Sequence, residues 1–219
     1  MLAFCRSNPF CRYLAPFLIW LLASAAQSAV PHSPLTWLTY AIKVIITVPV
    51  ILLLFKGHWA EIEGRFDRRA VWAGLAVLAA WLGNYTLCCA HSSAAFNPAT
   101  LSPAMALLAM TVRLAGASTV VPFLEETVWR SFLMRFLIRN DFLSVPLGTY
   151  SAWAFWITTL IFAAMHPISL WPAAAFAGWA YGMYLVKTKN LVGCMIAHGV
   201  TNLGLGLYAI ATQEWGLWG

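Results

Sequence analysis

Long apolar runs, separated by short polar segments, follow one another along the whole chain. A membrane-spanning helix needs about 20 apolar residues, because it rises about 1.5 Å per residue across a hydrocarbon core of about 30 Å. The runs predict about seven helical spans, near residues 14–30, 35–55, 70–90, 101–138, 148–166, 171–186 and 190–210. The expected fold class is therefore all-α: a polytopic membrane helix bundle that forms a single transmembrane domain over residues 1–219.

Two of these runs have features of their own. The fourth, 101–138, is too long for one straight crossing, and Pro122 is expected to divide it into an outer half and an inner half-helix at 123–138, because an interior proline bends or breaks a helix. The first run ends in small residues and follows two arginines, which is also typical of a cleavable signal peptide. Because further spans follow it, we expect a retained first helix.

Composition supports membrane insertion. The 219 residues are 62% hydrophobic and 9% charged, whereas soluble domains carry roughly a quarter charged residues. The 12 Trp, 13 Phe and 7 Tyr suit aromatic belts at two lipid–water interfaces. The net charge of +6 is spread over short loops, so no nucleic-acid partner is expected. Five cysteines with no CxxC pair argue against a disulfide framework and against a thiolate zinc site.

Basic residues occupy alternate loops, which predicts the orientation. They precede the first span and follow the second, fourth and sixth spans: Arg6 and Arg12; Lys56, Arg65, Arg68 and Arg69; Arg135 and Arg139; Lys187 and Lys189. The intervening segments 31–34, 91–100 and 167–170 and the C-terminal tail contain no Lys or Arg. Because Lys and Arg accumulate in cytoplasmic loops, the N-terminus is expected in the cytoplasm. The expected location is a bacterial inner membrane.

Two acidic residues stand inside an apolar run, where a polar side chain costs several kcal/mol unless it is paired or hydrated. Glu125 and Glu126 are adjacent in VVPFLEETVWRSFLM. Arg130 follows Glu126 by four residues, so these two share a helix face. Glu125 is turned about 100° from Glu126 and is left for another partner. A structural ion pair explains one glutamate and leaves the second unexplained.

Two histidines also lie in predicted spans. His166 ends TTLIFAAMHP, one turn after Phe162, and His198 lies in GCMIAHGVTN, one turn before Asn202. A single histidine in a span is more often an interhelical hydrogen-bond donor than a catalyst. Together with the glutamates, however, these residues supply a carboxylate base, two imidazoles and an amide donor, which is the set that hydrolysis by water requires.

These motifs resemble one family in order and spacing. EETVWR fits EExxxR, FAAMH fits FxxxH and HGVTN fits HxxxN, so residues 120–210 resemble the catalytic core of the CPBP intramembrane proteases, which include the CAAX endopeptidases. SVPLGTY and the LGLYAIATQEW tail are similar to the bacterial branch that accompanies exosortase sorting systems. Residues 1–100 match only as generic spans. Ser131 departs from the pattern, since many members have Gly after the motif arginine, and we expect the change to be tolerated.

The resemblance implies an intramembrane endopeptidase of the glutamate type. Glu125 and His166 would activate a water for attack on a peptide bond, while His198 and Asn202 would stabilise the oxyanion. The structural supports would be Glu126, Arg130 and Phe162. The implied substrate is a membrane-associated protein or peptide in the lipid bilayer, an exosortase-type sorting system is the implied partner, and no cofactor is expected.

Other hypotheses stay open. Zinc could be bound by His166, His198 and a glutamate, although HExxH is absent and the motifs offer these histidines no obvious carboxylate partner. Cys194, one turn before His198, could serve as a thiol nucleophile. A transporter, or a sorting or immunity accessory that acts by binding, would use the same residues for proton relay or ligand binding. Transporters of this type usually show internal repeats, and none is evident.

Counting residues from the basic loops leaves the site geometry open. Glu125 and His198 come out about 15 Å and about 13 Å deep, whereas His166 comes out about 24 Å up if its span starts near Tyr150. The remaining span charges, Lys43 and Arg113, are expected to reach the outer interface by snorkelling and are assigned no chemistry.

Overall fold

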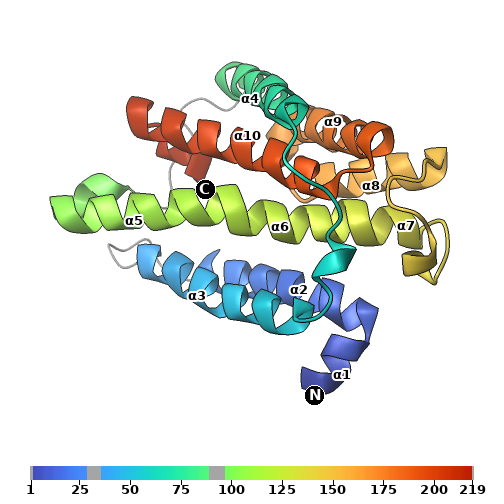
Figure 1. Ribbon diagram of the computed structural model, residues 1–219. Helices are drawn as coiled ribbons and strands as arrows, with labels where there is room; N and C mark the ends of the chain where they lie inside the picture. Colours follow the sequence, from blue (N-terminus) through green and yellow to red (C-terminus); the bar gives the residue numbers. More distant parts are fainter. Residues whose placement is uncertain (1, 29–35, 89–96, 219) are drawn as a thin grey trace.

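A computed structural model describes residues 2–28, 36–88 and 97–218 of the chain. The described residues contain no strand, and the chain is 84% helical, so the predicted all-α class is confirmed. Figure 1 labels the α-helices: α1 (Leu2–Ser7), α2 (Pro9–Ser28), α3 (Thr36–Phe55), α4 (Arg68–Cys88), α5 (Pro103–Ala115), α6 (Val121–Glu126), α7 (Met134–Phe136), α8 (Ala152–Ala164), α9 (Trp171–Thr188) and α10 (Leu191–Thr212).

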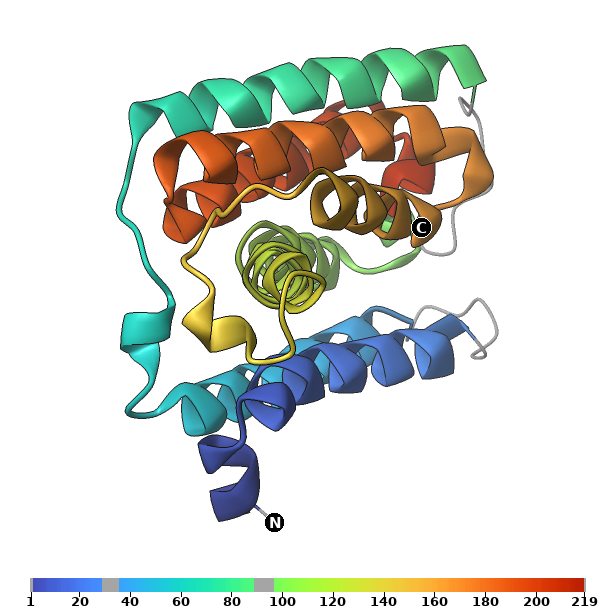
Figure 2. The ribbon, with the colours of Figure 1, turned by 90° about the vertical axis from the view of Figure 1, so that its right-hand side faces the viewer.

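The helices form layers around one central rod. Figure 2 looks along the rod made by α5, α6 and α7, with α2 and α3 packed on one side and α8, α9, α10 and α4 on the other. Helices α4 and α9 are seen side-on in that view, so the rod runs obliquely across them. The rod contacts both layers, and α10 packs against both α6 and α4. Side chains of the rod therefore face the core of the bundle.

Five helices are long and apolar enough to cross a membrane, which makes this an integral membrane protein. They are Pro9–Ser28, Trp37–Phe55, Arg68–Cys88, Pro103–Phe136 and Leu191–Thr212. Helices α8 and α9 occupy the positions of the predicted fifth and sixth spans, but α8 has only 13 residues and α9 does not reach the hydropathy of a span. The count of seven crossings thus stays a prediction. The predicted limits at residues 30, 35 and 90 lie outside the described residues.

The prediction that Pro122 divides the fourth run was wrong. Residues Pro103–Phe136 form one unbroken helix of 34 residues. It contains two wide π-type turns, Gly116–Val120 and Thr127–Leu133, and Pro122 is the second residue after the first of them. A wide turn relaxes the hydrogen-bond ladder where the missing proline N–H would break it. At about 51 Å the helix exceeds the hydrocarbon core, and an oblique path accommodates that length without a break.

The basic loops meet at one end of the bundle. Arg6 donates from Nη2 to the carbonyl of Lys56 (3.0 Å), and Lys189 donates from Nζ to the carbonyl of Gly148. Asn190 joins a third loop through its side chain, accepting from the Arg65 N–H (3.0 Å) and donating to the Arg65 carbonyl (2.8 Å). Helix α1 and the loops that follow α3, α7 and α9 are thereby tied together, in agreement with the predicted alternation of charge.

The N-terminal region differs from the prediction in two respects. Helix α2 begins at Pro9, so Arg12 lies inside the helix, 1% exposed, with Nη2 2.5 Å from Oε1 of Glu61. A buried arginine needs such a carboxylate, which the charge count along the sequence did not pair with it. In addition, Cys5 and Cys11 form one disulfide, a single local bridge that the argument against a disulfide framework did not foresee. They end up close because α1 turns directly into α2, placing the two residues 4.8 Å apart at Cα.

Candidate active site

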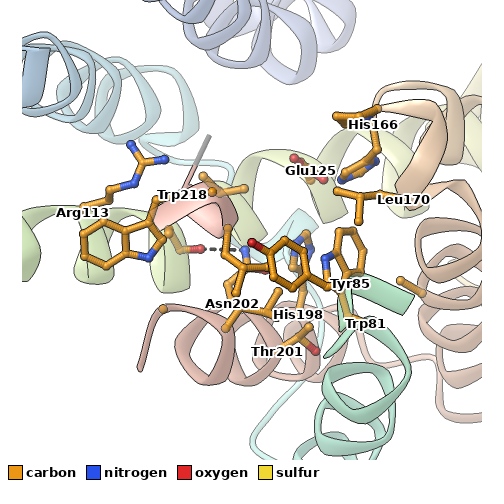
Figure 3. Close-up of a pocket in the computed structure, with 18 of the residues that line it drawn as sticks. Trp81, Tyr85, Arg113, Glu125, His166, Leu170, His198, Thr201, Asn202 and Trp218 are labelled. Atoms are coloured by element: carbon orange, nitrogen blue, oxygen red, sulfur yellow. Dashed lines mark hydrogen bonds between the residues drawn. The ribbon is translucent and has the colours of Figure 1, made fainter. Parts of the chain in front are cut away.

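The four residues assigned catalytic roles line one cavity of about 410 Å³. Glu125 reaches it from α6, His166 from the turn after α8, and His198 and Asn202 from α10. Figure 3 shows these four side chains around the same space. The predicted depth of His166 therefore does not separate it from Glu125. Residue counting had assumed straight spans, whereas α8 stops at Ala164 and His166 lies in the turn beyond it.

The two adjacent glutamates have different environments. Glu126 is fully buried; its Oε1 accepts a hydrogen bond from Nδ1 of His198 (2.8 Å), and its Oε2 lies 3.2 Å from Nε of Arg130. Glu125 lines the cavity, and within the described part of the chain its side chain makes no hydrogen bond or ion pair. The predicted pairing of Glu126 with Arg130 is thus present, and Glu125 is the carboxylate that faces open space.

His166 has one defined tautomer. Its Nδ1 lies 3.0 Å from the carbonyl oxygen of Phe162, and because a carbonyl can only accept, Nδ1 carries the hydrogen. The Nε2 atom of a neutral ring then keeps its lone pair. The ring is flanked edge-on by Trp81 (5.3 Å between centroids) and packs against Phe162 (5.1 Å). These contacts hold the imidazole at the cavity wall.

His198 and Asn202 are oriented by contacts with other helices. The His198 ring stacks on Tyr181 of α9, with centroids 5.3 Å apart and planes 19° apart. Asn202 donates from Nδ2 to the carbonyl of Ala117 (2.9 Å), inside the first wide turn of the rod. Next to His198, Gly199 allows close packing, since a Cβ there would stand 2.5 Å from the carbonyl oxygen of Ser118. The wide turn therefore serves as the docking point for α10.

Arg130 lies beneath the cavity and explains the motif phenylalanine. The guanidinium is 1% exposed and stands 4.6 Å from the ring centroid of Phe162 and 5.6 Å from that of Tyr181. Its Nη2 donates to the carbonyl of Gly178 (3.4 Å). Phe162 thus supports Arg130 with its ring and orients His166 with its carbonyl.

Two further expectations bear on the site. Ser131, the departure from the motif, is buried and accepts a hydrogen bond from Nη2 of Arg135 (2.7 Å), so its hydroxyl has a structural partner. Cys194 is fully buried, contacts the carbonyl of Tyr181 at 3.5 Å and does not line the cavity. A thiol in that position is not placed to attack a substrate in the cavity.

Zinc was tested against the side chains present. Within residues 2–28, 36–88 and 97–218, no group of three or more His, Cys, Asp or Glu side chains is placed to hold one metal ion. One argument used against zinc was wrong, however, because His198 does have a carboxylate partner in Glu126. The sequence had assigned Glu126 to an ion pair with Arg130, four residues later in the same helix. Its hydrogen bond with His198, 72 residues further along the chain, leaves no signal in sequence spacing.

The sequence also missed residues that shape the cavity. Trp81, Tyr181, Thr201 and Arg113 line it, and no short motif marks them. Tyr181 donates from Oη to Oγ1 of Thr201 (2.7 Å), which in turn donates to the carbonyl of Gly74 (2.8 Å). This chain of hydrogen bonds connects α9, α10 and α4 behind His198.

The fold and the site together describe an integral membrane protein in which a carboxylate, two imidazoles and an amide line one cavity. Residues 107–204 match the family model described as type II CAAX prenyl endopeptidase, Rce1-like, and the three motifs lie within that segment. Over these residues the chain is similar to the CAAX-type membrane proteases, as the motifs predicted, and the match supports an intramembrane endopeptidase that acts on a membrane-associated peptide. No curated protein and no solved structure matches the chain.

Proposed function

We propose that this endopeptidase cleaves its substrate with a water molecule activated by Glu125 and His166. The proposal rests on the different contacts of the two adjacent glutamates. Glu126 accepts a hydrogen bond from His198 and pairs with Arg130, whereas Glu125 faces the cavity. A general base needs a carboxylate that is free to take a proton, and only Glu125 of the pair meets that condition.

In the proposed reaction, Glu125 accepts a proton from the water as its oxygen attacks the scissile carbonyl carbon. His166 positions that water by accepting its second hydrogen at Nε2, since Nδ1 is committed to the Phe162 carbonyl. The proton held by Glu125 then passes to the leaving amine nitrogen as the C–N bond breaks. The products are an amine and a carboxylic acid that retains the second hydrogen of the water, so no co-reactant other than water is required.

Negative charge develops on the carbonyl oxygen, and His198 and Asn202 are assigned to stabilise it. Because Nδ1 of His198 donates to Glu126, Nε2 can donate to the oxyanion only when the ring is protonated, and the Glu126 carboxylate compensates that positive charge. Asn202 uses one amide hydrogen for the Ala117 carbonyl and retains the other.

Zinc is the second candidate, favoured by one contact. A carboxylate that accepts from the far nitrogen of a histidine is a common partner of zinc ligands, and Glu126 has that relation to His198. The described side chains nevertheless do not gather three ligands, so the proposed reaction uses no cofactor.

The substrate and location are proposed from the sequence. The likeness to the exosortase-associated branch makes a membrane protein handled by such a sorting system the first substrate to test. The same likeness favours a bacterial inner membrane, and the basic loops at one end of the bundle favour an N-terminus in the cytoplasm.

The decisive experiment compares two glutamate variants in lipid nanodiscs. Internally quenched apolar peptides, with and without a farnesylated cysteine, are incubated with wild type, Glu125→Gln and Glu63→Gln, and products are identified by mass spectrometry. Glu63 is exposed in an inner loop and is the matched control. We expect Glu125→Gln to abolish cleavage and Glu63→Gln to retain it. Full activity in Glu125→Gln would refute the assignment of the base.

A further inference from the structure

A short segment after α10 forms one end of the cavity that holds the proposed reaction centre. Leu217 and Trp218 of this segment line the same cavity as Glu125. In Figure 3, Trp218 lies at one end of the space, and Glu125 and His166 lie at the other. Asn202 lies between them. The cavity is therefore bounded, opposite the proposed base, by side chains that have no part in the proposed reaction.

The end of α10 turns this segment back over the cavity. Gln213, the residue after the helix, has a left-handed backbone (φ 60°), which is a common way for a helix to end. The next residues form a short 3₁₀ turn, Trp215–Trp218, that packs back against α10. Glu214 accepts a hydrogen bond at Oε2 from Oη of Tyr85 (3.2 Å), which ties the turn to α4. The turn is thus attached to two helices that line the cavity.

Contacts on several sides hold the ring of Trp218. The side chain is 7% exposed, and its ring centroid lies 5.2 Å from that of Trp215. The guanidinium of Arg113 stands 5.6 Å from the ring centroid of Trp218 and 4.9 Å from that of Tyr40. A Cβ added at Gly206 of α10 would lie 3.7 Å from Nε1 of Trp218, so the indole packs directly against this helix. A ring held in this way forms a fixed wall of the cavity.

The side chains that adjoin this wall are apolar. Leu114 of α5 and Trp218 both pack against Gly206, and Leu205 and Leu217 line the same cavity. A group bound between these leucines leaves water without gaining a hydrogen bond from them. Burial under such conditions stabilises an apolar group and costs free energy for a polar one. This end of the cavity is therefore suited to an apolar side chain.

We propose that Trp218 and Leu217 are specificity residues, which set the largest apolar side chain that a peptide substrate can place at this end of the cavity. A fixed wall admits a side chain that fits the space in front of it and rejects a larger one, because the larger one must displace packed groups. This inference rests on the proposed function, since it takes the reaction centre at Glu125 as the point of cleavage.

The position of the selected side chain follows from the helices beside the cavity. Gly206, against which Trp218 packs, lies one turn, about 6 Å, beyond Asn202 along α10. Leu114 lies about 16 Å from Glu125 along the continuous helix of the rod. An extended peptide covers about 3.4 Å per residue. The selected side chain should therefore lie about two to five residues from the cleaved bond.

The test varies the size of one substrate side chain at a time. The probes are internally quenched Ala/Val peptides in which a single position carries Ala, Leu or Trp, and that position is moved along both sides of the cleavage site. Cleavage is measured as kcat/KM in lipid nanodiscs, and the cleaved bond is identified by mass spectrometry. The size preference at each position is the ratio of kcat/KM for the Trp peptide to that for the Leu peptide.

Wild type should prefer Leu to Trp at least about tenfold at one position, because a small change of size in an apolar pocket alters kcat/KM about 10- to 200-fold. Trp218→Ala and Leu217→Ala should each raise the ratio about tenfold at that position and leave it unchanged at the others. Trp218→Phe should raise it less. Trp72→Ala is the matched control, since Trp72 is 70% exposed on α4 and does not line the cavity, and its ratio should equal that of wild type.

A merely structural role of Trp218 would give a different result. Loss of folded protein lowers kcat/KM for all peptides by the same factor and leaves the ratio as it was. A ratio that stays the same in Trp218→Ala and Leu217→Ala, or that rises equally in Trp72→Ala, would overturn the inference. Each variant is first checked by thermal unfolding, and Leu217→Ala and Trp218→Phe serve if Trp218→Ala does not fold.

Binding separates this inference from the proposed function. The same peptides are titrated onto the Glu125→Gln protein with and without Trp218→Ala, so that the measurement does not require hydrolysis. A size preference in binding that shifts with Trp218→Ala, in a protein that hydrolyses no peptide when Glu125 is intact, would refute the proposed function and leave the role of Trp218 standing. Cleavage that needs Glu125 but keeps its size preference in Trp218→Ala would do the opposite. Absence of binding to both proteins would overturn the inference.

Discussion

Replacing Glu126 by glutamine should destabilise the fold strongly, although the side chain keeps its size. Glu126 is fully buried and carries the charge that faces Arg130 (3.2 Å) and His198 (2.8 Å). Without that charge, the Arg130 guanidinium keeps one carbonyl, that of Gly178 at 3.4 Å, and the face of Phe162. Removing one partner of a buried ion pair costs about 3–5 kcal/mol, because the other charge is left uncompensated.

The magnitude can be measured by a double-mutant cycle in detergent micelles. Glu126→Gln and Arg130→Met are each expected to lower the free energy of unfolding by about 3–5 kcal/mol. The double variant should lose much less than the sum, because neither charge is then left alone. Glu125→Gln is the matched control, and its cost should stay below about 1 kcal/mol, since the described residues give its side chain no partner.

Two results would refute this account of Glu126. If the two single costs add in the double variant within about 0.5 kcal/mol, the residues are not coupled. If Glu126→Gln unfolds as wild type does, the buried charge is not what holds the rod to α10.

Three further predictions test other parts of the structure. His166→Asn should lower the cleavage rate at least about 100-fold without changing the thermal unfolding midpoint. Peptide cleavage assays and thermal unfolding measure the two quantities, and an unaffected cleavage rate would exclude a role of His166 in water activation. Protein stripped by strong chelators should keep its activity, whereas activity that vanishes and returns with added zinc would replace the mechanism by a metal-dependent one. Ser131→Gly should cost about 1.5–3 kcal/mol of unfolding free energy by removing the acceptor of one Arg135 nitrogen, Nη2, and a neutral effect would show that the hydroxyl contributes nothing.

The length of the apolar runs predicted where the helices lie, but it did not establish how many of them cross the membrane. The apolar runs identified every long helix to within a few residues, because about 20 apolar residues can hardly do anything else in this composition. The length of the apolar run could not distinguish α9 from a membrane-spanning helix, because α9 is nearly as long as one. Pro122 was misjudged because a wide turn just before it, which absorbs the missing N–H, has no sequence signal of its own.

The sequence predicted which polar residues gather at the cavity, but only some of the contacts between them. Glu125, His166, His198 and Asn202 were found because polar residues inside apolar runs are costly and few. The link from Glu126 to His198 was missed, as were the contacts of Lys43 and Arg113 with the ring of Tyr40, because these contacts depend on which helices are neighbours in space. Helical spacing reports contacts within one helix and is silent on those between helices.

The contact that was missed connects the stability of the fold to the proposed chemistry. Glu126 balances Arg130 within the rod and orients His198 across to α10, so one carboxylate holds two helices together and sets the donor nitrogen of a candidate oxyanion ligand. A substitution that preserves the rod while releasing His198 must therefore keep the negative charge and change its reach. Glu126→Asp does so, because the carboxylate is withdrawn by one methylene, about 1.5 Å. We expect this variant to retain more stability than Glu126→Gln and still to lose cleavage. A Glu126→Asp protein as active as wild type would show that His198 is oriented by its stacking on Tyr181 and not by the carboxylate.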